Sequence, residues 1–353
     1  MEIRKSIIVT GGAGYIGSHT CLSLLQNGYE IYVIDSLVNS YEISLKRVMN
    51  LYLLKGGKDN KVNFFKGDIR DINLLSSIFE IAKKKDTPIV GVVHLAGLKS
   101  ASDSFSEIID YFEFNLQGSI ELIKVMDKFN CRNLVFSSSA SVYSVDNKLP
   151  YKEEFKIQSS SPYGESKLTV ENFLKYLSMD QSKNWKFIIL RYFNPVSSHE
   201  SGLIGEVPKY NKNNLFPNIY SVLQNRSQFL KIYGNDWPSD DGTQIRDFIH
   251  VMDIAEGHAK ALDFLLNNDD KFNIVNLGSG DGRTVLQIIK YFEKANQCSI
   301  PIKFCKRRER DSFSSIADIS YAENLMNWIP KRSLEDICQD GFNWIKKNPN
   351  GYF

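Results

Sequence analysis

Residues 6–17 read Ser6-Ile7-Ile8-Val9-Thr10-Gly11-Gly12-Ala13-Gly14-Tyr15-Ile16-Gly17. A short apolar run ends here in closely spaced glycines, and apolar positions then recur at helical spacing until Asn27-Gly28. This order predicts a buried parallel strand, a tight turn and the N-terminus of a helix. Such a turn presents unpaired backbone N–H groups and the positive end of the helix dipole, and glycine lets a pyrophosphate come close. The stretch therefore predicts a dinucleotide site.

A carboxylate follows one strand–helix–strand unit later. Residues 32–35 (Tyr-Val-Ile-Asp) read as a second buried strand that ends in Asp35. Dinucleotide-binding folds carry their ribose-binding acid at this place. Asp35 can accept hydrogen bonds from both ribose hydroxyls and would repel a 2′-phosphate, so the pattern predicts NAD rather than NADP. A plain turn or helix-capping role for Asp35 is the alternative.

The composition is that of an ordinary globular enzyme. The chain has 353 residues, 42% hydrophobic and 24% charged, enough for one large domain or two moderate ones. A net charge of +2 gives no reason to expect nucleic acid or a membrane surface as partner. Five cysteines without a CxxC pair indicate reduced thiols and no metal site. With no membrane-length apolar stretch and no signal-type N-terminus, we expect a cytoplasmic protein.

Short apolar runs alternate with helical segments beyond Asp35, which predicts a doubly wound parallel (Rossmann) α/β sheet. Asp68 and Ile69 follow the third run, where they could accept from an adenine amino group and pack on its ring, or simply form a turn. His94 lies inside the fourth apolar run and is expected to be a core residue. Lys99 follows that run at the sheet edge where ligands bind.

A tyrosine and a lysine supply the candidate acid–base chemistry. Tyr163 and Lys167 are four residues apart on a helix that begins after Pro162, so they share one face. An adjacent ammonium favours the phenolate and lowers the pKa of the tyrosine, which gives a usable general acid and base. A serine run, residues 137–141, ends the fifth strand and can hydrogen-bond a substrate oxygen or serve as a plain loop. A tyrosine and a lysine four residues apart can occur by chance in a chain rich in both. The position of this pair after the fifth strand favours the functional interpretation.

These features together resemble the extended short-chain dehydrogenase/reductase family. Four motifs make the chain similar to the UDP-galactose 4-epimerases within that family, and the resemblance runs from Ser6 to Tyr352. The motifs are residues 14–20 (Gly-Tyr-Ile-Gly-Ser-His-Thr), 94–99 (His-Leu-Ala-Gly-Leu-Lys), 191–196 (Arg-Tyr-Phe-Asn-Pro-Val) and 247–253 (Asp-Phe-Ile-His-Val-Met-Asp). The resemblance implies an NAD-binding Rossmann domain, residues 1–193 with a return segment near 247–265, and a smaller mixed α/β UDP-sugar-binding domain, residues 194–353. It also implies a homodimer, with the segments 105–130 and 163–177 as candidate contacts.

The implied reaction is the NAD-dependent interconversion of UDP-galactose and UDP-glucose through a 4-keto intermediate. By resemblance, Tyr163 removes the proton from the sugar 4-hydroxyl, Ser139 relays it, and Lys167 holds the nicotinamide ribose and lowers the tyrosine pKa. Hydride leaves carbon 4 for NAD and returns to the opposite face, so tight cofactor binding is expected. The implied cofactor-binding residues are Gly11, Gly14, Tyr15, Ile16, Gly17, Asp35, Asn39, Ser40, Asp68, Ile69, Leu95, Ala96, Gly97, Lys99, Asn115, Ser137, Tyr163, Lys167, Tyr192 and Phe193. The implied substrate-binding residues are Lys99, Ser139, Ser141, Tyr163, Asn194, Asn214, Leu215, Lys231, Tyr233, Arg246, Arg308, Asp311 and Ser315.

Three positions depart from, or vary within, the family pattern. Arg310 and Ser144 stand where glycine is usual, which affects the expected loop geometry and not the reaction. Ser315 stands where a bulky tyrosine restricts the sugar pocket in some family members. Its small side chain implies that UDP-N-acetylglucosamine and UDP-N-acetylgalactosamine are also interconverted.

Other functions remain open at this point. A nucleotide-sugar 4,6-dehydratase needs an acid and a base beside the catalytic serine or threonine, where this chain has Ala140 and Ser141. A nucleotide-sugar decarboxylase is a second enzyme alternative, which a product assay would reveal. A regulator that binds NAD without catalysis is the third, although such a protein would be free to lose Tyr163 or Lys167.

Overall fold

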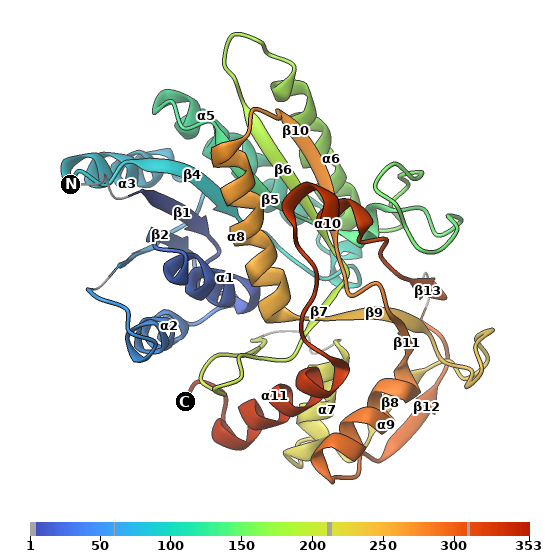
Figure 1. The fold of residues 1–353 in the computed structure, drawn as a ribbon. Coiled ribbons are helices and arrows are strands. Elements are labelled where there is room, and N and C mark those ends of the chain that lie inside the picture. Colours follow the sequence, from blue (N-terminus) through green and yellow to red (C-terminus); the bar gives the residue numbers. More distant parts are fainter. Residues whose placement is uncertain (1–4, 60, 210–213, 309–310) are drawn as a thin grey trace.

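The computed structural model describes residues 5–59, 61–209, 214–308 and 311–353. In this part of the chain, seven parallel strands form one sheet in the order β10-β6-β5-β4-β1-β2-β3 (Figure 1). The strand order reverses between β1 and β4, as in doubly wound folds, which confirms the predicted fold class. The strands are β1 (Ser6–Thr10), β2 (Glu30–Asp35), β3 (Val62–Lys66), β4 (Ile89–His94), β5 (Asn133–Ser139), β6 (Lys186–Tyr192) and β10 (Phe272–Leu277).

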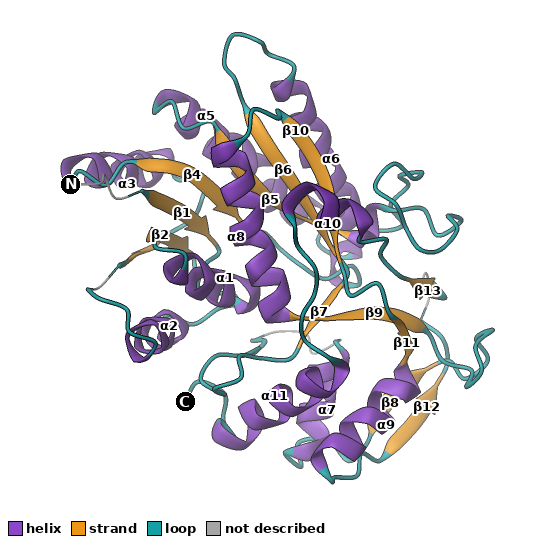
Figure 2. Ribbon diagram, in the orientation of Figure 1, coloured by secondary structure: helices purple, strands orange, loops and turns teal. Residues whose placement is uncertain are grey.

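Helices cover both faces of this sheet (Figure 2). Ile7 and Val9 of β1 face one core and Ile8 faces the other, because successive side chains of a strand alternate. The first core includes residues of α1 (Tyr15–Gln26), α2 (Ile43–Leu54) and α8 (Val251–Asn267). The second includes residues of α3 (Ile72–Lys84), α5 (Gly118–Lys128) and α6 (Pro162–Ser178). Shorter helical segments are η1 (Asp103–Phe105), α4 (Ile108–Phe112), η2 (Glu113–Gln117) and η3 (Ala140–Val142).

A second group of elements has its own apolar core. Its strands are β7 (Asn194–Val196), β8 (Leu230–Tyr233), β9 (Ile245–His250), β11 (Gly282–Thr284), β12 (Ile302–Cys305) and β13 (Ser314–Ser315). β9 pairs with β7, β11 and β13, and β8 pairs with β12. The helices are α7 (Leu215–Leu223), α9 (Val285–Asn296), α10 (Ser320–Met326) and α11 (Leu334–Lys347). Side chains of α7, α9 and α11 pack around the large rings of Phe216, Phe292 and Trp344.

The chain crosses from this second group back to the first. β9 runs directly into α8, which packs against α1, and β10 then joins the edge of the large sheet beside β6. The division into domains of residues 1–193 and 194–353 stays a prediction. No helix among the described residues is long and apolar enough to cross a membrane.

A buried ion pair holds together the strands that lead to the site. Arg191 Nη2 on β6 lies 2.6 Å from Glu171 Oε2 on α6. Ser138 of β5 donates to the same carboxylate at 2.5 Å, so α6, β5 and β6 meet at one point. His94 is buried, as expected, with Thr10 Oγ1 2.7 Å and Ser119 Oγ 2.9 Å from its ring nitrogens.

Candidate active site

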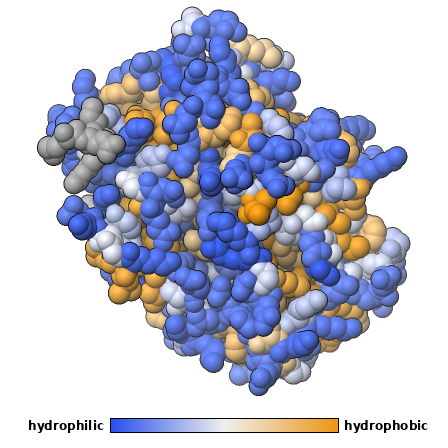
Figure 3. Space-filling model, viewed as in Figure 1, coloured by the Kyte–Doolittle hydropathy of each residue, from blue (hydrophilic) through white to orange (hydrophobic). Residues whose placement is uncertain are grey.

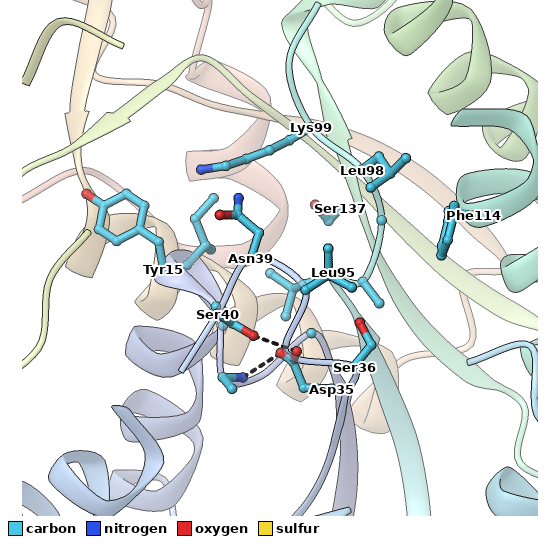
Figure 4. A pocket seen from close by; sticks show the side chains of 18 of the residues that line it. Tyr15, Asp35, Ser36, Asn39, Ser40, Leu95, Leu98, Lys99, Phe114 and Ser137 are labelled. Carbon is cyan, nitrogen blue, oxygen red and sulfur yellow. Dashed lines mark hydrogen bonds between the residues drawn. The ribbon is translucent and has the colours of Figure 1, made fainter. Parts of the chain in front are cut away.

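One pocket opens at the carboxyl ends of β1, β2, β4 and β5, where the strand order reverses (Figure 4). The glycine turn lines one side, and Tyr163 and Lys167 of α6 line the other. All predicted cofactor-binding residues except Asn115 and Phe193 line this pocket. Asn115 lies behind it and holds the loop after β4, since its Oδ1 accepts from the Leu98 N–H at 2.7 Å. Phe193 is buried, and its N–H donates to Leu277.

The glycine turn has the shape of an anion cradle. Gly11 adopts a φ of +71°, and a Cβ there would lie 2.7 Å from the Ala96 nitrogen. A Cβ on Gly17 would lie 2.1 Å from the Gly11 carbonyl oxygen, so neither position has room for a side chain. Gly14 is the N-cap of α1 and supplies no side-chain cap to its first N–H groups. Open N–H groups at a helix N-terminus fit a pyrophosphate.

Asp35 fixes the loops on the ribose side of the cradle. Its Oδ2 accepts from the Ala13 N–H at 3.0 Å, and its Oδ1 accepts from the Leu37 N–H at 2.9 Å and from Ser40 Oγ at 2.7 Å. A carboxylate has about four acceptor positions, so these bonds leave capacity for a ribose hydroxyl. The turn-forming role and the ligand-binding role predicted for Asp35 are therefore compatible. Together with the cradle, this carboxylate fits NAD.

Asp68 carries an ion pair that its sequence context did not suggest. Arg70 Nη2 lies 2.8 Å from Asp68 Oδ2, and the Arg70 guanidinium stacks 3.9 Å from the centre of the Phe114 ring. Burial raises the pKa of Asp68, but the hydrogen bonds and charge of Arg70 outweigh it and lower the pKa overall. Asp68 is therefore an ionised acceptor at the pocket wall, beside the nearly buried Ile69.

Tyr163 lies in the first turn of α6. Ser161 caps this helix, accepting from the Gly164 N–H at 3.2 Å, and Pro162 occupies the first helical position. Burial raises the pKa of Tyr163, and a hydrogen bond with Ser139 partly opposes the rise. The pKa of Tyr163 is therefore raised overall, contrary to the predicted lowering.

Lys167 lines the same pocket from the next turn of α6. Its side chain is almost fully buried, and its Nζ donates to the carbonyl oxygen of Ser137 at 2.9 Å. Burial lowers the pKa of Lys167 to about 8, and the charge of Glu171 opposes this effect. The ammonium is held at the end of β5 by this bond, and burial, opposed only by Ser139, decides the direction of the Tyr163 pKa shift.

The predicted substrate-binding residues of the second group lie on β7, β8, β9 and β13, at the start of α7, and between β12 and β13. Arg308 stacks its guanidinium 3.8 Å from the centre of the Tyr233 ring. Ser315 pairs with Arg246 across β13 and β9. Burial lowers the pKa of Arg246, and the charge of Asp311 opposes this effect. Asn194 begins β7, Asn214 and Leu215 begin α7, Lys231 is exposed on β8, and Ser141 donates to Ser139 at 2.9 Å.

The sequence patterns did not predict several residues that line the pocket. Gly205, Glu206, Val207, Pro208 and Tyr352 line the pocket from the second group of elements. Glu206 pairs with Lys99 at 3.1 Å. These residues lie in irregular segments without periodicity, so the sequence pattern held no signal for them. The predicted departure at Arg310 lies outside the described residues, and Ser144 is buried, its N–H bonded to Lys156.

Comparison with known proteins gives a consistent result. The NAD dependent epimerase/dehydratase family model matches residues 7–278. UDP-glucose 4-epimerase 2 of Arabidopsis thaliana is 42% identical over 350 residues, which cover 99% of this chain and 97% of that protein. A UDP-glucose-4-epimerase from Stenotrophomonas maltophila, solved with NAD and formylated UDP-arabinopyranose, has a TM-score of 0.91 at 36% identity, covering 98% of this chain and 99% of that one. A UDP-glucose 4-epimerase from Bifidobacterium longum, solved with NAD⁺ and UDP, has a TM-score of 0.89 at 38% identity, covering 98% and 100%.

Proposed function

The chain belongs to the NAD dependent epimerase/dehydratase family, and we propose that it interconverts UDP-galactose and UDP-glucose through a 4-keto intermediate with tightly bound NAD. The observation that carries the proposal is a pocket that joins a glycine turn of dinucleotide type to Tyr163 and Lys167. Relatives that match over almost the whole chain are named UDP-glucose 4-epimerases.

The chain's own residues account for how the cofactor would be held. When bound, NAD supplies a hydride acceptor and donor at its nicotinamide ring. The open N–H groups of Tyr15 and Ile16 would bind the pyrophosphate, and Asp35 the adenosine ribose. Lys167 would hold the nicotinamide ribose from the end of β5. Because the reaction is redox-neutral, the protein gains nothing from releasing the dinucleotide between turnovers.

Tyr163 is the proposed acid and base at the sugar 4-hydroxyl. It takes the proton as the C–O bond becomes a ketone, and it returns the proton when the hydroxyl forms again on the opposite face. Burial raises the pKa of Tyr163, so the hydrogen bond with Ser139 is the contact that stabilises the phenolate as the proton leaves. Ser139 would also relay the proton from the sugar.

The UDP part of the substrate would bind to the second group of elements. Arg246 and Arg308 are proposed to hold the diphosphate, because a planar guanidinium can form paired hydrogen bonds with phosphate oxygens. Asp311 would bind the uridine ribose and Tyr233 would stack on the uracil. Asn194, Asn214, Leu215, Lys231 and Ser141 complete the proposed substrate set, with Lys99 shared between the two ligands.

An assay on UDP-galactose with no added NAD tests cofactor, reaction and base together. We expect UDP-glucose to form from cofactor that copurifies, and Tyr163→Phe to lower kcat by at least about 100-fold while it keeps its NAD. Tyr291→Phe, a change of the same kind on the surface of α9, should behave as wild type. A 4-keto-6-deoxy product would indicate a 4,6-dehydratase, and a decarboxylated product from UDP-glucuronate would indicate a decarboxylase. No turnover by NAD-loaded protein would indicate a regulator that binds NAD without catalysis.

A second substrate pair is also proposed. Ser315 carries a small, partly buried side chain on β13, directly beside Arg246 in the sheet register. A serine here leaves space that a tyrosine ring would fill. We therefore propose that UDP-N-acetylglucosamine and UDP-N-acetylgalactosamine are also interconverted.

The assembly we propose is a homodimer. Ile109 is 77% exposed on α4 and Tyr176 is 73% exposed on α6, and these two helices pack against each other. Most of the face seen in Figure 3 is hydrophilic, with apolar residues only in patches. Large apolar side chains left in water on neighbouring helices favour a contact with a second copy.

The free cysteines support a location of the protein in a reducing compartment. All five cysteines are free, and Cys21, Cys131 and Cys338 are buried in apolar surroundings. Unpaired buried cysteines are typical of proteins of the cytoplasm, which is the location we propose.

A further inference from the structure

Glu206 is a nearly buried carboxylate at the edge of the pocket. Its side chain is 6% exposed, and its Oε1 lies 3.1 Å from the Nζ of Lys99. Lys99 follows β4 of the large sheet, whereas Glu206 precedes α7 of the second group of elements. The ion pair therefore spans the pocket from one group of elements to the other. Because the Lys99 side chain is 51% exposed, the carboxylate is the fixed partner and the lysine the movable one.

The backbone and neighbours of Glu206 explain why it is fixed. The Tyr352 hydroxyl donates to the Gly205 carbonyl at 3.0 Å and accepts from the Gly205 N–H at 3.2 Å. Gly205 also packs on the indole of Trp344, where a Cβ would approach to 2.5 Å. On its other side, Glu206 Oε1 lies 3.5 Å from Asn214 Nδ2.

The pair lies near the end of the pocket where the pyrophosphate would bind. Burial raises the pKa of Tyr15, the first residue of α1, and the charge of Glu206 is the second cause of that rise. Figure 4 shows the Lys99 side chain extending toward the side of the pocket that carries Tyr15. Among the described lining residues, Lys99 and Lys167 are the two cations, and Lys167 already donates to Ser137. Lys99, whose side chain is half exposed while Lys167 is buried, is therefore the cation that can also reach a pyrophosphate.

We infer that Glu206 is a positioning residue that holds the Lys99 ammonium across the pocket and so retains the bound dinucleotide. The inference rests on the proposed function for the identity of that ligand, NAD. A lone buried carboxylate would repel a pyrophosphate, but a carboxylate paired with Lys99 keeps a long, mobile cation in place. Without Glu206, the lysine side chain would spend most of its time in solvent.

A double-mutant cycle on NAD affinity tests this directly. We would measure the Kd of added NAD by calorimetry on protein freed of its cofactor, for Glu206→Ala, Lys99→Ala and the double variant. If Glu206 acts through Lys99, each single change raises Kd about tenfold or more, and the double variant binds no more weakly than Lys99→Ala. Glu206→Gln keeps an oxygen that can accept from Lys99, so its Kd should lie between those of wild type and Glu206→Ala. Additive losses, or unchanged or tighter binding by Glu206→Ala, would overturn the inference.

A matched control exists in the same part of the chain. Glu200 pairs with Lys55 at 3.2 Å, but its side chain is 68% exposed and lies outside the pocket lining. Glu200→Ala should leave the Kd for NAD unchanged, and an equal loss in this variant would point to a general electrostatic effect instead. Since NAD affinity is measured without sugar, a wild type that binds NAD but does not epimerise UDP-galactose would refute the proposed function alone.

Discussion

The ammonium of Lys167 lies 2.9 Å from the carbonyl oxygen of Ser137, at the carboxyl end of β5. Burial lowers the pKa of this lysine from 10.5 to about 8, so its charge is lost as the pH rises through about 8. The charged form carries three N–H donors and the positive charge that favours the phenolate of Tyr163. We therefore expect epimerase activity to fall above about pH 8, measured as kcat/KM for UDP-galactose across a pH series.

Lys167→Arg separates this titration from other causes. A guanidinium stays protonated over the whole accessible range, so the decline should vanish in this variant even if its maximal activity is lower. A decline with the same midpoint in both proteins would assign the titration to another group.

Two substitutions in the glycine turn should have different effects, one on NAD binding and the other on folding stability. Gly14 has an ordinary φ of −72°, and a Cβ there would meet only the Gly11 carbonyl oxygen, at 3.2 Å. Gly14→Ala should therefore unfold at nearly the wild-type urea concentration but lose its NAD. Gly11→Ala combines a φ of +71° with a clash against the backbone of Ala96, and it should cost about 2–5 kcal/mol of folding free energy. Full NAD occupancy in Gly14→Ala would show that a ligand does not approach this residue.

The proposed dimer can be tested at Ile109. Replacing this exposed side chain of α4 with aspartate would bury two charges in a symmetric contact. We expect Ile109→Asp to weaken self-association by at least about 100-fold, measured by sedimentation. Leu54→Asp changes an equally exposed residue, 78% against 77%, on α2 of the other sheet face, and it should remain a dimer. Dissociation of both variants, or of neither, would move the contact away from α4.

Local patterns were sufficient for the sheet and for one side of the pocket. The run from Ser6 to Gly17 contains its own strand, turn and helix start, and Asp35 ends the next strand. Such features depend on neighbouring residues, so their order along the chain predicts their place at the sheet edge. The fold class could be predicted for the same reason.

The opposite side of the pocket depends on contacts between distant residues. Glu206 and Tyr352 approach the glycine turn only because the second group of elements folds against the sheet. The pKa of Tyr163 depends on burial, which its spacing from Lys167 does not reveal. Likewise, the ion pair between Arg70 and Asp68 could not be predicted from the two residue types alone. Charge pairing and burial depend on the tertiary structure, so local sequence patterns could not predict them.

Ser315 is the residue on which substrate range should depend. It is the register partner of Arg246 across β13 and β9, beside the proposed diphosphate site, and we propose that its small side chain leaves room for the 2-acetamido group of an N-acetylhexosamine. Ser315→Tyr should reduce kcat/KM for UDP-N-acetylgalactosamine by at least about 100-fold and keep that for UDP-galactose within about tenfold, because a ring excludes only the larger sugar. Ser315→Ala, which adds no bulk, should keep both activities. Parallel product assays on the two sugars measure the ratio directly. If the wild type never turns over the N-acetylated substrate, or if both activities fall together in the tyrosine variant, Ser315 does not set the size of the sugar pocket.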